Sequence, residues 1–505
     1  MNLGSYILSL VIWVPIIGGF LVLATKGDDS KAEAARWIGL LFSLLTLVLC
    51  IPLYLGFNVN DPNMQYIENL TWIPLLNVHY ALGIDGISLL FIMLTSFTTF
   101  VVILASWKTI SFKVSQYMSV FLLTCGVTNG VFAATDTFLF YVFWEAALIP
   151  MTLGIGIWGG KEKARAAIKF FLFTFFGSVF LLVALIYFYC RTGSWAITEF
   201  YGVTLSDEAQ WLLFAAFWIA FAVKVPMWPL HTWLPDAHTE APAGGSVVLA
   251  ALMLKLGAYG FIRFALPILP QIHQSLDWVL IALSLIAIVY VGFATIAQTD
   301  AKRLIAYSSI SHMGIVTLGI FVVFMIVTKT GNPEDAALAI QGAVFQMIAH
   351  AFSSGGMFIG IGYLYTRLES RNISDFGGVA KYMPIFAAFY MLFAMSNVGL
   401  PGTSGFVGEF MVILATFKAD PWLALLAGLT LIIAPGYTLL MYKRVFFGKP
   451  NVKNEEKIAA LKDLSALEIS VFVLLAIPTL FFGFYPEPIL SLSQAASNGF
   501  VHSLI

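Results

Sequence analysis

The sequence has very little charge, and this shortage limits what the protein can be. Of its 505 residues only 10% are charged, whereas 60% are hydrophobic, and its mean hydropathy is +0.90. A soluble domain does not have this balance, so we expect a lipid bilayer to surround the chain. No polar stretch is long enough for a separate soluble domain, and a formal net charge of −1 gives no indication of nucleic-acid binding.

Cysteine and targeting signals are also scarce. The three cysteines, Cys50, Cys125 and Cys190, lie far apart in apolar segments and form no C-x-x-C pair, which argues against disulfides and iron–sulfur ligation. The apolar stretch Leu3–Thr25 lacks a basic start and a small-residue cleavage site. We therefore interpret it as a first membrane span and not as a cleaved signal peptide.

What the sequence does contain is long apolar runs. A span needs about 20 apolar residues, and the sequence predicts an all-α membrane protein with about fourteen spans, each end being uncertain by several residues. They lie at about 3–24, 35–57, 82–106, 116–133, 136–158, 167–190, 210–229, 243–266, 277–296, 302–327, 337–366, 383–417, 422–446 and 466–486. In the long 337–366 span, Gly356 and Gly360 have the spacing that is typical of close helix packing.

The basic residues support an even number of spans. Twenty of the 26 lysines and arginines fall in alternate loops, near residues 26–36, 108–113, 161–169, 302–303, 367–381 and 443–462. The opposite loops hold only Arg191, Arg263, Lys329 and Lys418. Because basic loops stay in the cytoplasm, both termini are predicted on the other, periplasmic side.

Two spans are expected to be discontinuous. Pro226 and Pro229 follow Lys224 in the seventh span, and the twelfth is interrupted at Pro401 and Gly402. Each break falls in the fourth helix of a five-helix unit, 116–266 and 277–446, and an odd helix number makes the second unit enter from the opposite face. We expect these two inverted repeats to follow a three-helix segment, 1–115, and to precede a cytoplasmic loop and the last helix, 447–505.

Six ionisable residues lie inside different apolar spans. One internal histidine is often only a packing residue, but six such groups on six spans indicate an ion or proton path. A lysine at the bilayer centre costs roughly 2.5–3.5 kcal/mol, which makes a purely structural role a weak explanation for the whole set. The six are Glu145, Lys224, Lys255, His312, His350 and Glu409.

The chemistry of this set suggests an order of transfer. Burial favours the neutral form of each group, and a nearby opposite charge favours the charged form. We expect Glu145 and Lys224 to lie within direct or one-water reach, so that opening the pair lets Lys224 pass its proton on. The receivers would be Lys255, then the histidines through water, then Glu409.

Three further polar residues follow the first break. His231 and His238 flank the sequence TWLPDA, which contains Asp236, and here loop capping or a proton-access path is favoured over a metal site. We therefore expect no metal in this chain.

Several long motifs resemble one known family. FAVKVPMWPLHTWLPDAHTEAPAGGSVVLAALMLKLGAYG, DTFLFYVFWEAALIPM, QTDAKRLIAYSSISHMGIV, FQMIAHAFSSGGMF and GLPGTSGFVGEF are similar to the antiporter-like membrane subunits of proton-pumping NADH:quinone oxidoreductase, respiratory complex I. The resemblance covers most of the chain. It implies fourteen helices, two inverted repeats and a midplane path in which the family's charged residues fall on Glu145, Lys224 and Lys255, and its internal histidines on His312 and His350.

The resemblance also implies partners and a location. The L and N subunits of the complex and the multisubunit Na+/H+ antiporter subunits commonly carry lysine in span 12, whereas this sequence has Glu409, as the third antiporter-like subunit of the complex does. We expect L and N neighbours in a bacterial inner membrane, and lipid around the chain. NAD, FMN, iron–sulfur clusters and quinone would all be bound by partner subunits and none by this chain.

Two alternatives stay open. A subunit of a cation/proton antiporter would use the same acid–base residues, and Glu409 argues against it without deciding. A scaffold that transmits conformational change without carrying protons would tolerate neutralisation of Glu145 or Lys224. A self-contained solute carrier is less favoured, because no polar cluster stands apart from the acid–base set.

Overall fold

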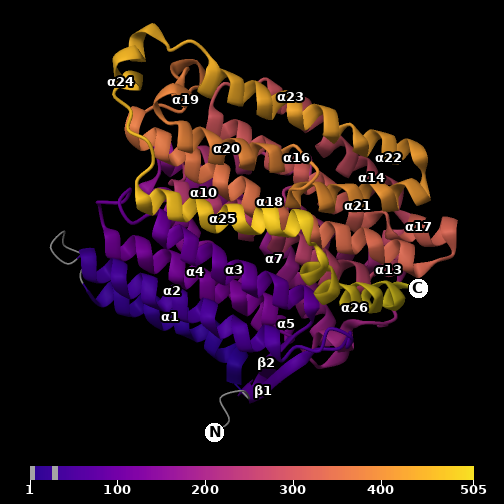
Figure 1. Cartoon of the computed structure of the whole chain (residues 1–505). Helices are drawn as coiled ribbons and strands as arrows, with labels where there is room; N and C mark the ends of the chain where they lie inside the picture. Colours follow the sequence, from indigo (N-terminus) through magenta and orange to yellow (C-terminus); the bar gives the residue numbers. More distant parts are fainter. Residues whose placement is uncertain (1–5, 26–31) are drawn as a thin grey trace.

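The computed structural model describes residues 6–25 and 32–505 and is almost entirely helical (Figure 1). The predicted first residue of span 1, Leu3, and the basic residues Lys26 and Lys31 lie outside the described residues. The helices run roughly side by side, with α1 and α2 along one edge of the molecule in Figure 1 and α22 and α23 along the opposite edge.

The first half of the chain forms α1 to α12. Their bounds are α1 (Ile7–Ala24), α2 (Ala32–Leu55), α3 (Gly86–Ala105), α4 (Val114–Ala133), α5 (Thr137–Ala146), α6 (Leu148–Trp158), α7 (Lys163–Thr192), α8 (Asp207–Lys224), α9 (Trp233–Glu240), α10 (Ala243–Val248), α11 (Leu254–Gly260) and α12 (Leu266–Ile268). Two π-helical turns, Leu249–Met253 and Phe261–Ala265, join α10, α11 and α12 into one span.

The second half forms α13 to α26. Their bounds are α13 (Pro270–Ser275), α14 (Asp277–Ile286), α15 (Gly292–Ile296), α16 (Ala301–Phe321), α17 (Val323–Thr330), α18 (Pro333–Leu368), α19 (Val379–Tyr382), α20 (Pro384–Asn397), α21 (Ser404–Ala419), α22 (Pro421–Gly428), α23 (Thr430–Tyr442), α24 (Glu455–Ala459), α25 (Ala466–Phe484) and α26 (Glu487–Leu504). The penultimate helix, α25, turns back across the bundle and packs against both α3 and α18 (Figure 1).

The multi-pass helical fold is confirmed. Eleven of the fourteen predicted spans coincide with described helices that are long and apolar enough to cross a membrane. The other three predicted segments coincide with α4, with α8 and with α20 plus α21, which are helical but shorter or less apolar. The count of about fourteen and the division into two five-helix units stay predictions.

A hairpin and a long helix are the largest elements that were not predicted. An antiparallel hairpin pairs β1 (Gln65–Ile73) with β2 (Val78–Ile84), with Leu70 opposite Tyr80. The second is α26, which follows the last predicted span and packs against α3 and α18. Both lie at the end of the bundle opposite α19 and α24, which belong to the basic loops (Figure 1).

Gly356 and Gly360 of α18 are close-packing sites, as their spacing predicted. A Cβ atom on Gly356 would come 2.5 Å from the Phe393 ring, and one on Gly360 would come 2.6 Å from the Tyr390 ring. A Cβ on the neighbouring Gly355 would meet Val247 at an ordinary 3.6 Å. The absence of side chains at Gly356 and Gly360 therefore lets α20 approach α18 closely.

This difference predicts a stability effect between adjacent residues. Gly356→Ala should destabilise the protein by about 1–3 kcal/mol, because the buried Phe393 ring must move. Gly355→Ala is the matched control and should be neutral or stabilising, since alanine is the better helix former. Thermal unfolding in detergent micelles, followed by circular dichroism, would measure both. Equal unfolding midpoints for the two variants would contradict this account of the helix contact.

Candidate functional site

The first predicted break is present and leaves Lys224 as the last residue of α8. Ser206 caps the start of this helix, because its hydroxyl accepts a hydrogen bond from the backbone N–H of Ala209 at 3.4 Å. After Lys224 the chain leaves the helical path through Pro226 and Pro229 and becomes helical again at Trp233. The break thus places a lysine, 3% exposed, inside the protein beside irregular backbone.

The second predicted break separates α20 from α21. The connecting residues 398–403 include Pro401 and two glycines in the left-handed region, Gly399 at φ 75° and Gly402 at φ 91°. The chain re-enters a helix at Ser404, and Glu409 follows in the second turn of α21. Glu409 is 1% exposed, so this break also leads to a buried ionisable group.

Three of the predicted site residues lie on the innermost helices. The spans that carry Lys255, His312 and His350 are the Ala243–Ile268 span, α16 and α18, which are almost entirely covered by other helices. The π-helical turn Leu249–Met253 comes just before Lys255. Such turns widen a helix, and the Lys255 amino group hydrogen-bonds back to the carbonyl of Ala250 within this turn at 2.6 Å.

The structure brings four of the six predicted residues into one sequence of contacts. The Nζ atom of Lys255 lies 2.9 Å from Nδ1 of His350. The imidazole rings of His350 and His312 have centroids 5.7 Å apart. Nδ1 of His312 lies 2.7 Å from Oε1 of Glu409. The series Lys255, His350, His312 and Glu409 thus runs from the first predicted repeat into the second without leaving the protein interior.

Two polar residues that we had not predicted complete this series. The side-chain amide of Gln346 donates to Oε1 of Glu409 at 3.0 Å, and the Tyr437 hydroxyl lies 3.4 Å from Nε2 of His312. Gln346 precedes His350 by four residues, so its place on the same helix face could have been read from the sequence. Oε2 of Glu409 and Nε2 of His350 are buried without a hydrogen-bond partner among the described residues.

The remaining two predicted residues, Glu145 and Lys224, do not form a direct ion pair in the structure. Nζ of Lys224 lies 3.4 Å from the carbonyl oxygen of Trp144 and 3.8 Å from the centroid of its indole ring. Within the described part of the chain, no carboxylate lies within ion-pair distance of Lys224. Glu145 is the residue next to Trp144 and interacts electrostatically with Lys224. Its Oε1 atom is buried and has no hydrogen-bond partner among the described residues, so a contact through one water stays a prediction.

The three residues proposed for proton access lie in different surroundings. Asp236 pairs with Lys169 at 2.6 Å and Arg303 at 3.5 Å near the surface. His231 is half-buried. His238 is fully buried and stacks on Phe358, and neither of its ring nitrogens has a partner among the described residues. Asp236 and His238 are therefore not hydrogen-bonded to each other.

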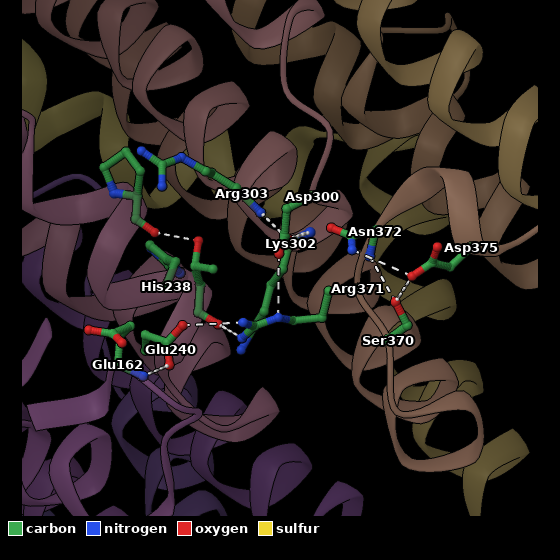
Figure 2. A network of polar contacts seen from close by, with 12 residues as sticks. Glu162, His238, Glu240, Asp300, Lys302, Arg303, Ser370, Arg371, Asn372 and Asp375 are labelled. Carbon is green, nitrogen blue, oxygen red and sulfur yellow. Dashed lines mark hydrogen bonds and ion pairs between the residues drawn. The ribbon is translucent and has the colours of Figure 1, made fainter.

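A second polar network lies beside His238 at the basic end of the bundle (Figure 2). Arg371 binds Glu240 at 3.2 Å and Asp300 at 3.4 Å, and it also donates to the carbonyl of Thr239. The backbone N–H of Glu162 donates to Glu240 at 3.0 Å. These contacts join the end of α9 to the starts of α7 and α16 and to the loop after α18. We had not predicted this network, because Arg371 was interpreted only as a basic loop residue and its acidic partners were not singled out.

This arrangement defines a class of protein: a multi-pass membrane protein with two broken helices and a buried acid–base series that runs from the Ala243–Ile268 span to the second of them. Each member of the series can accept and donate a proton, and burial keeps the protons from exchanging freely with bulk water. The geometry is suited to moving protons inside a membrane.

Comparisons with known proteins agree with this class. Residues 134–434 match the family model described as NADH:quinone oxidoreductase/Mrp antiporter, transmembrane. NADH-quinone oxidoreductase subunit M of Rhodobacter capsulatus is 42% identical over 496 residues, which cover 95% of this chain and 93% of the relative. NADH-ubiquinone oxidoreductase chain 4 of Marchantia polymorpha is 36% identical over 98% of this chain and 97% of its own length.

Solved structures are similar along the whole chain. A chain of respiratory complex I from Thermus thermophilus superposes with a TM-score of 0.87 and 30% identity, covering 99% of this chain and all of that one. A chain of the Mrp complex from Dietzia sp. superposes with a TM-score of 0.84 at 20% identity and shares the fold. The protein belongs to the NADH:quinone oxidoreductase/Mrp antiporter membrane family.

Proposed function

We propose that this chain is the M subunit of bacterial complex I and translocates protons outward when the complex oxidises NADH and reduces quinone. Relatives named as subunit M align with it almost end to end, and Glu409 stands where the family resemblance implies a lysine in the L and N types. The enzyme would be an NADH:quinone oxidoreductase of the H+-translocating class. NAD, FMN, iron–sulfur clusters and quinone would be bound by other subunits, and the L and N subunits would be the membrane neighbours.

The observation that carries the proposal is the series from Lys255 to Glu409. Direct contacts of 2.9 Å and 2.7 Å join the two ends to His350 and His312. Neutral imidazole has one donor and one acceptor nitrogen, so each histidine can take a proton on one side and release it on the other. The 5.7 Å between the two ring centroids and the interval between Lys224 and Lys255 are the steps where water would assist.

The two breaks then have distinct roles. Lys224, near Glu145 at the first break, would pass protons through water to the Lys255 end of the series, and Glu409, beside the second break, would release them. His231, His238 and Asp236 would provide proton access at the first break. Because neighbouring groups titrate together, the series acts as one coupled unit and no member has an independent proton affinity. Both termini would lie on the periplasmic side of the inner membrane.

Glu409→Gln tests the proposal. Glutamine keeps the size and a hydrogen-bond acceptor but cannot carry a proton. Because a positioned proton carrier typically contributes about 100-fold or more, its loss should slow coupled turnover by at least about tenfold. NADH-driven quinone reduction and proton uptake would be followed together in membrane vesicles, after the assembly of the complex is checked.

The matched control is Glu334→Gln, which neutralises an exposed carboxylate at the start of α18. It should leave both rates unchanged. If Glu409→Gln also assembles and pumps at the full rate, the series does not conduct protons and the scaffold alternative is favoured.

A further inference from the structure

Lys224 has an unusual partner for a buried ammonium group. Its Nζ atom lies 3.8 Å from the ring centroid of Trp144, whereas the seven other cation–ring distances among the described residues run from 5.2 to 5.9 Å. Tryptophan is the aromatic side chain whose face attracts cations most strongly, and the attraction increases where water is excluded. Together with the hydrogen bond to the Trp144 carbonyl at 3.4 Å, the indole face therefore stabilises the Lys224 ammonium in this structure.

The Trp144 ring is held firmly in place. It is fully buried, and its Nε1–H donates to the Ser178 hydroxyl on α7 at 2.9 Å. Ser178 in turn donates to the carbonyl of Thr174 at 2.9 Å, so its lone pairs face the indole. Phe221, one turn before Lys224 on α8, packs edge-on against the ring with centroids 5.6 Å apart. These contacts present one fixed face of the indole to the end of α8.

Trp144 and Glu145 are adjacent at the end of α5, so Lys224 has two alternative partners that differ by one residue. The carboxylate of Glu145 attracts the ammonium through its negative charge, and the ring of Trp144 attracts it through the quadrupole of its π system. In this structure Lys224 contacts the ring, while Oε1 of Glu145 is buried and unpaired among the described residues.

We infer that Trp144 is a positioning residue that holds the Lys224 ammonium while the Glu145–Lys224 pair is open. The inference rests on the proposed function of that pair. The ring lets the pair open without leaving a bare ammonium in hydrocarbon, and because it accepts no proton, it keeps the Lys224 proton available for the next carrier. Lys224 would thus alternate between the carboxylate of Glu145, which stabilises its protonated form, and the neutral ring of Trp144, which binds the ammonium without accepting its proton.

Fluorinated tryptophan at position 144 tests this directly. Fluorine withdraws electron density from the ring face and weakens cation binding with little change of shape, so a structural role would hardly respond. We expect coupled quinone reduction in the assembled complex to fall stepwise from tryptophan to its mono-, di- and tetrafluorinated forms, with a total loss of about tenfold. The same series of fluorinated tryptophans, incorporated in place of Trp233, is the matched control. That ring is equally buried and donates from Nε1 to the carbonyl of Val223, and no cation lies over it among the described residues.

Lys224→Gln in the same vesicles separates the positioning role of Trp144 from the proposed function of the Glu145–Lys224 pair. If this variant loses coupled activity while the fluorinated forms at Trp144 remain fully active, the positioning role is overturned and the proposed function stands. If Lys224→Gln is itself fully active, the proposed function fails and the inference fails with it. An equal decline at Trp144 and Trp233 would also overturn the inference, since it would reflect a general effect of fluorine.

Discussion

Glu145→Ala is expected to stop coupled turnover in a complex that still assembles. Removing the carboxylate leaves Lys224 without the acidic group that acts on it electrostatically. A lysine without a carboxylate partner in the bilayer interior costs up to about 2.5–3.5 kcal/mol, which corresponds to a loss of as much as roughly 100-fold. Because electron transfer and pumping are coupled in the proposed function, quinone reduction and proton uptake should fall together. Both would be measured in membrane vesicles energised with NADH.

Two further variants make this result specific. Glu145→Asp keeps the charge and should retain much of the activity. Glu199→Ala removes an exposed carboxylate outside the spans and should have no effect. If Glu145→Ala pumps normally, the proposed role of Glu145 in the proton path is wrong. A scaffold that transmits motion without carrying protons then becomes the better explanation.

The helices and their breaks were predictable because the bilayer imposes strong rules. A span needs a long apolar run, and proline removes a backbone donor, so both leave clear marks in the sequence. Pro226 and Pro401 therefore located the ends of α8 and α20 to within a few residues. The β1–β2 hairpin and α26 obey no such rule. Strands of nine and seven residues and an 18-residue helix containing several serines resemble ordinary loop sequence.

The six ionisable residues were predictable for a related reason: charge is so rare in the spans that each instance is informative. Trp144 and Tyr437 were missed because aromatic residues make up 15% of the chain and most of them only pack. The contact of Lys224 with Trp144 depends on a side-chain rotamer, which spacing along the chain does not determine. Arg371 was missed because its partners, Glu240 at the end of α9 and Asp300 just before α16, are distant in sequence and only the fold brings them together.

Lys255→Arg should lose as much activity as Lys255→Met. Comparing these two variants is the strongest test of proton transfer by Lys255. Lys255 is completely buried between the carbonyl of Ala250 and Nδ1 of His350. Arginine keeps the charge and the donors but does not deprotonate in proteins, so it cannot pass a proton to His350. A positioned proton carrier typically contributes about 100-fold or more. We therefore expect both variants to reduce NADH-driven proton uptake by about 100-fold.

The comparison of the two variants distinguishes charge from proton release. Lys329→Arg and Lys329→Met change an exposed lysine at the end of α17 and should leave uptake unchanged. If Lys255→Arg pumps while Lys255→Met does not, the position needs only a fixed positive charge. His350 would then receive its proton from another donor, and because His238 is buried nearby with both ring nitrogens unpartnered among the described residues, it would be the next residue to replace. If both variants fail equally, Lys255 itself must release a proton, and the 2.9 Å contact with His350 is the step through which the two halves of the protein communicate.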